Sequence, residues 1–85
     1  MSKKEKLAVR LKRKPTDFTY SELRTLLSGM GYAEDSKGKT SGSRVSFINE
    51  TTKHIISLHK PHPGNILKRY QINIIVDELI KMELL

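Results

Sequence analysis

The segment 18–31 constrains the fold of this chain most, because it carries the signals for both ends of a helix. Thr19 and Glu22 have the spacing of a capping box, in which each side chain accepts a hydrogen bond from the other residue's backbone N–H. Gly31 is suited to the left-handed conformation that ends many helices. We therefore predict a helix between Thr19 and Gly31. Its apolar residues recur on one face at helical spacing, and they are Tyr20, Leu23, Leu26, Leu27 and Met30.

Three short stretches after this helix are predicted to form β-strands. In the second stretch, Val45 and Phe47 share one face, while Arg44 and Ser46 take the other. Turn-forming residues separate the stretches, so the chain can fold back on itself as an antiparallel meander. The predicted strands cover residues 32–35, 43–49 and 54–59.

Residues 67–82 are predicted to form a second long helix, because the apolar run is too long for one strand. The run is rich in β-branched residues, which makes a strand the alternative. We expect a buried helix with a wide apolar face. Its apolar residues are Tyr70, Ile72, Ile74, Ile75, Val76 and Leu79.

The element order α-β-β-β-α predicts an α+β fold. Both helices would cover one face of a three-stranded antiparallel sheet, and the other face would stay open to solvent or ligand. Arg44 and Ser46 are expected on the open face. A chain of 85 residues holds one domain with one modest core. Because it has no cysteine, disulfides and cysteine-based metal sites are excluded.

Residues 1–18 are predicted to be a basic N-terminal extension, and residues 19–85 the main domain. Leu7 and Leu11 could form the apolar side of a short helix, although a helix of this length is marginal in isolation. A solvated tail is the alternative. The chain shows no apolar run long enough to span a membrane and no signal peptide, so we expect a soluble cytoplasmic protein.

Positive charge is concentrated in two blocks of a chain whose formal net charge is +7. Residues 1–14 and 37–69 each hold seven basic side chains and one acidic one, whereas residues 15–36 and 70–85 are net acidic. This pattern indicates a polyanionic partner. The meander would bring the cations of the second block together, and we predict that they bind phosphate rather than only solvate the surface. They include Lys37, Lys39, Arg44, Lys60 and Lys68.

The Gly/Ser-rich stretch before the second strand is another candidate for phosphate binding. Its glycines and hydroxyl residues, Ser41 and Ser43 among them, could present backbone N–H groups to a phosphate. Its spacing matches neither a Walker loop nor a dinucleotide-binding fingerprint. An ordinary flexible connection is the alternative.

The histidines are the candidates for proton transfer. His59 and His62 lie at the loop that leads into the last helix. A histidine can take the proton of a ribose 2′-hydroxyl or donate one to a leaving 5′-oxygen near neutral pH. Metal binding is the rival interpretation, but H-x-x-H without nearby acids or cysteines supplies too few ligands. His54 is expected to be structural or merely exposed.

Other kinds of catalytic site find no support in the sequence. The chain has no G-x-S-x-G motif and no cysteine for nucleophilic catalysis. Its acidic residues are scattered, which argues against a two-metal phosphodiesterase. We therefore expect neither a metal nor a small-molecule cofactor.

The order of these motifs resembles the HicA toxins of type II toxin–antitoxin systems, over about residues 19–85. The resemblance implies a fold like the double-stranded RNA-binding domain. It also implies metal-independent cleavage of messenger RNA and a HicB-type antitoxin protein as partner. The motifs that carry the resemblance are the helix ending in Gly31-Tyr32, Gly42-Ser43-Arg44 at the second strand, and Pro61-His62-Pro63-Gly64-Asn65 before the last helix.

The chain departs from the family at one position. HicA toxins usually carry Gly-Ser-His at the start of the second strand, and that histidine is regarded as catalytic, whereas this chain has Arg44. An arginine stays protonated and cannot act as a general base, but it can bind phosphate or stabilise a transition state. Either His62 or His59 transfers the proton instead, or the protein binds RNA and cuts poorly.

We therefore predict an RNA-binding toxin with ribonuclease activity on messenger RNA. The alternatives are a non-catalytic binder of structured RNA and a basic module that binds an acidic protein. Catalysis is assigned to His62, His59 and Arg44. RNA binding is assigned to Lys37, Lys39, Ser41, Ser43, Arg44, Lys60 and Lys68.

Overall fold

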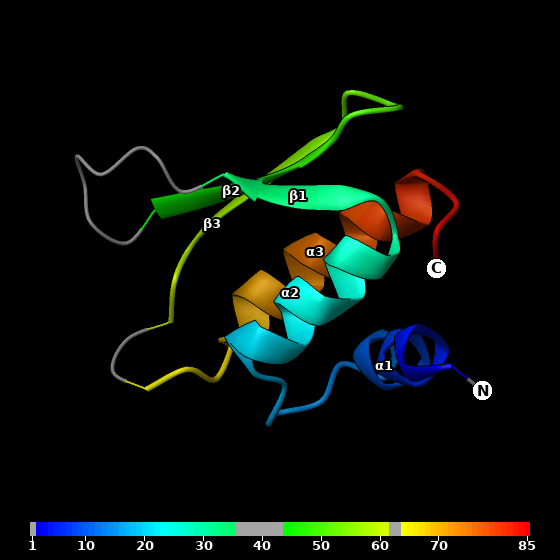
Figure 1. Cartoon of the computed structure of the whole chain (residues 1–85). Helices are drawn as coiled ribbons and strands as arrows, with labels where there is room; N and C mark the ends of the chain where they lie inside the picture. The colour runs from blue at the N-terminus through cyan, green and yellow to red at the C-terminus, as the bar shows by residue number, and fades with distance from the viewer. Residues whose placement is uncertain (1, 36–43, 62–63) are drawn as a thin grey trace.

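The structure is a computed structural model that describes residues 2–35, 44–61 and 64–85 (Figure 1). The described part contains no helix that is long and apolar enough to cross a membrane. The element order is α-α-β-β-β-α. The elements are α1 (Lys3–Lys12), α2 (Tyr20–Gly29), β1 (Tyr32–Asp35), β2 (Arg44–Asn49), β3 (Ile55–His59) and α3 (Arg69–Lys81).

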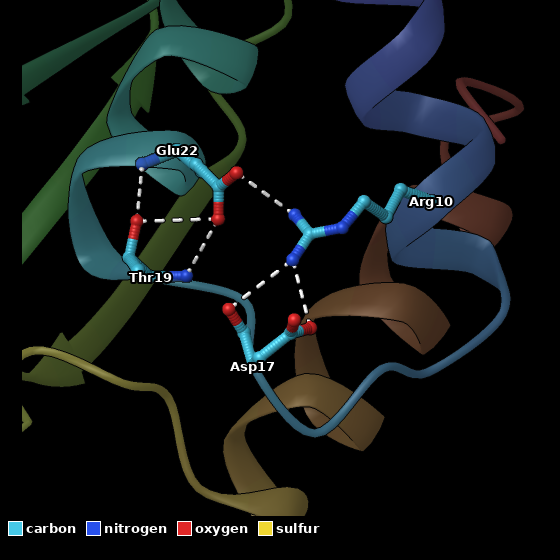
Figure 2. A network of polar contacts seen from close by, with 4 residues as sticks. All are labelled: Arg10, Asp17, Thr19 and Glu22. Atoms are coloured by element: carbon cyan, nitrogen blue, oxygen red, sulfur yellow. Dashed lines mark hydrogen bonds and ion pairs between the residues drawn. The ribbon is translucent and has the colours of Figure 1, made fainter.

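Helix α2 begins and ends where its capping signals place it. The Thr19 hydroxyl accepts a hydrogen bond from the Glu22 backbone N–H at 3.1 Å, and the Glu22 carboxylate accepts one from the Thr19 N–H at 2.9 Å (Figure 2). Gly31 has a φ of +98°, the left-handed conformation expected after the last turn. The predicted capping box and helix end are therefore confirmed.

The three strands form an antiparallel sheet in the order β1-β2-β3. Along β2, Val45 and Phe47 are buried, whereas Arg44 is exposed and Ser46 half-buried. Helices α2 and α3 lie together on one side of the sheet (Figure 1). The α+β fold, similar to the double-stranded RNA-binding domain, and the open face with Arg44 and Ser46 are confirmed.

Helix α3 buries a narrower face than its apolar residues suggest. Ile72, Ile75, Val76 and Leu79 are buried in the core as predicted. Tyr70 and Ile74, however, are 57% and 51% exposed, so their predicted burial was wrong. A helix that packs on one side cannot bury every position of such a dense apolar run, because successive residues turn by about 100°. The two exposed residues are one turn apart and lie on the same side of α3.

The N-terminal segment forms a helix that is part of the core rather than a solvated tail. Its Leu7 and Leu11 are 8% and 0% exposed, and they belong to the same core cluster as the residues of α2 and α3. A capping box between Ser2 and Glu5 starts the helix. Of the two interpretations that the sequence left open, the structure shows the short helix and not the solvated tail.

Arg10 ties α1 to the start of α2 (Figure 2). Its guanidinium lies 2.8 Å from an Asp17 carboxylate oxygen and 2.9 Å from a Glu22 carboxylate oxygen. Burial alone would raise the pKa of Glu22, but the hydrogen bonds from Thr19 and Arg10 outweigh it and lower the pKa. One carboxylate thus completes the cap of α2 and anchors α1 at the same time.

Replacing Leu11 with alanine should lower the free energy of unfolding by about 2–5 kcal/mol, because it leaves a cavity among fully buried side chains. Val9 lies on the same helix and is 44% exposed. Val9→Ala is therefore the matched control, with an expected change within about 0.5 kcal/mol. Urea unfolding monitored by circular dichroism measures both. Equal, small changes in the two variants would show that α1 is not packed as described.

Candidate nucleic-acid interface

Arg44 and His59 lie opposite each other at the end of the sheet. They are paired in the antiparallel register of β2 and β3, and both are exposed on the open face. Side chains that face each other across such a pair have Cβ atoms about 4.5–5.5 Å apart. The register therefore joins two residues that the sequence separates by a turn, one permanently charged and one able to transfer a proton.

A partly open pocket of about 140 Å³ lies beside this pair, between the edge strand β3 and helix α3. We call it the β3–α3 pocket. Tyr70 and Ile74, two exposed apolar residues of α3, form part of its wall. An apolar and aromatic wall next to a cation suits an unstacked nucleobase attached to a phosphate. The lining residues are Arg44, Ser57, Leu58, His59, Tyr70, Gln71, Ile74 and Ile75.

Gln71 fixes the two sides of this pocket relative to each other. Its side-chain amide donates a hydrogen bond to the His59 carbonyl at 2.8 Å, and its carbonyl accepts one from the Lys68 N–H at 3.0 Å. The residue is only 4% exposed. Both ends of a buried amide are thus satisfied, and the end of β3 is held against the first turn of α3.

Lys60 and Lys68 do not line the pocket. The Lys60 ammonium lies 5.7 Å from the centroid of the Tyr20 ring, at the start of α2. Lys68 is the exposed N-cap residue of α3. The Tyr20 hydroxyl donates a hydrogen bond to Glu34, and burial together with this bond raises the pKa of Tyr20. His59 and Lys60 are adjacent in sequence but have different neighbours: His59 lines the β3–α3 pocket, whereas Lys60 lies over the Tyr20 ring.

His54 connects the β2–β3 turn to α3 rather than to the pocket. The Tyr32 hydroxyl is 2.6 Å from His54 Nδ1, and His54 Nε2 donates a hydrogen bond to Glu78 at 2.7 Å. This bond, followed by one from Lys81, lowers the pKa of Glu78. Burial, and then the charge of Glu78, raises the pKa of Tyr32. These contacts agree with the structural role expected for His54.

Several predicted site residues lie outside the described residues, namely Lys37, Lys39, Ser41, Ser43 and His62. Six of the described pocket residues, all except Arg44 and His59, were not predicted as site residues. Tyr70 and Ile74 were assigned to the core, and Gln71 was not considered. A glutamine at the third position of a helix can accept a hydrogen bond from the N-cap N–H, and this half of a capping box was the available signal. Within the described ranges, no three His, Asp or Glu side chains are grouped as a metal site would require.

Comparison with protein families gives one match that covers most of the chain. A family model described as the HicA toxin of bacterial toxin–antitoxin systems matches residues 20–82. The matched range contains α2, the whole sheet and α3, and therefore every residue of the β3–α3 pocket. Helix α1 precedes it. Neither the curated proteins nor the solved structures contain a significant match.

Replacing Gln71 with alanine should lower the free energy of unfolding by about 1–3 kcal/mol, because a buried side chain is removed and the His59 carbonyl and the Lys68 N–H lose their partner. Asn73→Ala, a change of similar size at a half-buried position of α3, is the control and should cost less than about 0.5 kcal/mol. Chemical denaturation of both variants measures the difference. If Gln71→Ala is as stable as the control, the hydrogen bonds of Gln71 do not hold β3 against α3.

Proposed function

The chain belongs to the HicA toxin family of bacterial toxin–antitoxin systems, and we propose that it is a toxin that binds and cleaves messenger RNA at the β3–α3 pocket. The observation that carries this proposal is the pairing of Arg44 with His59 on the wall of one pocket. Arg44 can bind a phosphate and His59 can transfer a proton, and the pocket beside them can hold a nucleobase.

Binding of the RNA at this pocket uses two kinds of contact. Arg44 binds the scissile phosphate through its guanidinium, whose planar donors match the phosphate oxygens. Tyr70 offers an exposed ring on which one base can stack, and Ile74 extends the apolar wall beside it. Stacking requires an unpaired base, so we propose single-stranded segments of messenger RNA as the substrate.

Cleavage proceeds by attack of the ribose 2′-oxygen on the adjacent phosphorus. A general base takes the 2′-hydroxyl proton as the 2′-oxygen–phosphorus bond forms, and a general acid gives a proton to the 5′-oxygen as its bond to phosphorus breaks. The products are a 2′,3′-cyclic phosphate and a free 5′-hydroxyl. We assign the base and acid roles to His59 and His62, and the stabilisation of the transition-state charge to Arg44. This chemistry requires no metal ion or other cofactor.

The remaining cations guide the RNA strand on either side of the cleaved bond. Lys60, over the Tyr20 ring, and Lys68, at the start of α3, are exposed and would contact flanking phosphates. The predicted RNA-binding residues between β1 and β2 belong, like Arg44, to the basic block 37–69, and they would add further contacts to the RNA. They are Lys37, Lys39, Ser41 and Ser43.

A HicB-type antitoxin is the proposed protein partner, because the family consists of toxins of toxin–antitoxin systems. We further propose that the protein acts in the cytoplasm, where its messenger RNA substrate is found.

Arg44 favours a second candidate function, RNA binding without cleavage. Arg44 stands where the family usually carries its catalytic histidine, so the site has lost one group that can transfer a proton. A chain that binds structured RNA without cutting it would also explain the cationic surface. Cleavage of a bound transcript distinguishes the two functions.

A labelled transcript incubated with the protein and a metal chelator should be cleaved, with a bell-shaped dependence of the rate on pH.

In the same assay, His59→Ala and His62→Ala should each lower the cleavage rate about 10²-fold or more while leaving RNA affinity nearly unchanged. His54→Ala is the matched control, since that histidine lies away from the pocket, and its rate should stay normal below its unfolding temperature. Arg44→His restores the residue usual in the family and should raise the rate.

Full activity in both His59→Ala and His62→Ala would overturn the assigned chemistry. Salt-sensitive binding of the transcript without any cleavage would support the non-catalytic alternative. A stoichiometric amount of the HicB-type antitoxin should suppress cleavage by the unmodified protein.

A further inference from the structure

A second pocket, of about 90 Å³, lies between the α1–α2 connection and the first turn of α3. We call it the α1–α3 pocket. Leu67 and Ile72 are buried and form its apolar floor, whereas Lys14 and Arg69 are exposed at its rim. The pocket is lined by Lys14, Pro15, Thr16, Leu67, Arg69 and Ile72.

The two sides of the α1–α3 pocket are joined through the backbone. The Leu67 N–H donates a hydrogen bond to the Phe18 carbonyl at 2.9 Å, and the Tyr20 N–H donates one to the Asn65 carbonyl at 2.8 Å. The segment entering α3 is therefore fixed beside the connection that follows α1. This contact keeps Lys14 and Arg69 at one site although 54 sequence positions separate them.

The positive charge at this site has no acidic ion-pair partner in the part of the chain that the structure describes. Among the residues that the structure describes, neither Lys14 nor Arg69 forms an ion pair, and the nearby Asp17 is already bound to Arg10. Further exposed cations are neighbours of the rim residues in the sequence. On α1 and just after it these are Lys12 and Arg13, and before α3 it is Lys68.

We infer that the α1–α3 pocket is a second phosphate-binding site, and that RNA bound at the β3–α3 pocket continues onto it around the start of α3. The two pockets share no lining residue, and they lie on different sides of the first turn of α3. Tyr70 and Gln71 line the β3–α3 pocket, whereas Arg69 and Ile72 line the α1–α3 pocket. A strand that leaves one pocket therefore reaches the other by passing the first turn of α3 at Lys68.

An anionic membrane would be the other polyanion for a basic helix, but the packing of α1 argues against it. Membrane-surface helices insert an exposed apolar face between lipids. In α1, Leu7 and Leu11 are buried in the protein core, and only Val9 is an exposed large apolar residue. A surface with cations and almost no apolar side chains binds through phosphate charges, which is how proteins hold nucleic-acid backbones.

This inference rests on the proposed function, because it names a second contact for the same RNA. Lys14 lies outside the family-matched residues 20–82, so the N-terminal segment adds affinity for RNA to a domain that carries the chemistry. Removal of the Lys14 charge should weaken RNA binding and leave the cleavage rate at saturating RNA unchanged.

Lys14 and Lys53 offer a matched pair of variants. Both are exposed lysines with a left-handed backbone, with φ of 55° and 66°, and glycine adopts this conformation without strain. Each substitution by glycine therefore removes one charge while preserving the local fold. Lys53 is in the β2–β3 turn and lines neither pocket.

The experiment measures binding of a single-stranded RNA with a 2′-deoxy substitution at the scissile position, at several salt concentrations. Lys14→Gly and Arg69→Ala should each weaken binding and reduce the slope of log affinity against log salt by about 0.7, the value for one phosphate contact with a single strand. Lys53→Gly should change neither quantity by a comparable amount.

Equal effects of Lys14→Gly and Lys53→Gly would overturn the inference, because they would show only a loss of net charge. If Arg44→Glu still weakens binding in that case, the proposed function stands and only the second site fails. Failure of the unmodified protein to bind RNA in a salt-dependent way would overturn both. Normal RNA binding by Lys14→Gly with a weakened antitoxin complex would assign the pocket to an acidic protein instead.

Discussion

Val45 and Phe47 of β2 can be buried against the helices only if the residues between them face away, because successive side chains of a strand point to opposite sides of the sheet. The same alternation along β3 buries Ile56 and Leu58. It leaves Arg44 on the open face, where the antiparallel register sets it opposite His59. A shift of the register by one residue would turn these side chains into the core, so the packing that stabilises the sheet also assembles the candidate site.

Helix α3 forms the second wall of the candidate site. Its apolar residues extend beyond the face that packs on the sheet, so Tyr70 and Ile74 stay exposed. Gln71 then holds its first turn against the end of β3. The pocket is therefore formed by residues that also stabilise the fold, and its walls come from a strand and a helix rather than from loops. Such elements hold a site more rigidly than loops do.

Much of the fold could be predicted from the sequence, because its signals are local. The capping box at Thr19, the helix end at Gly31 and the alternation in β2 each depend on residues within a few positions. The exposure of Tyr70 and the position of Lys60 over the Tyr20 ring could not be predicted, because both depend on how α3 and β3 dock in three dimensions. The docking of α1 was left open for the same reason, since Arg10 binds Asp17 and Glu22 only after the chain has turned.

The most direct test of the site is to map where RNA contacts the protein. Amide resonances of the labelled protein would be followed by nuclear magnetic resonance while a single-stranded RNA, made resistant to cleavage by 2′-deoxy substitution, is added. We expect the largest chemical-shift changes at Arg44, Ser57, His59 and Tyr70, and no change in the β2–β3 turn around Lys53. If the amide resonances of these four residues do not change when RNA is added, the assignment of the β3–α3 pocket as the RNA site is contradicted.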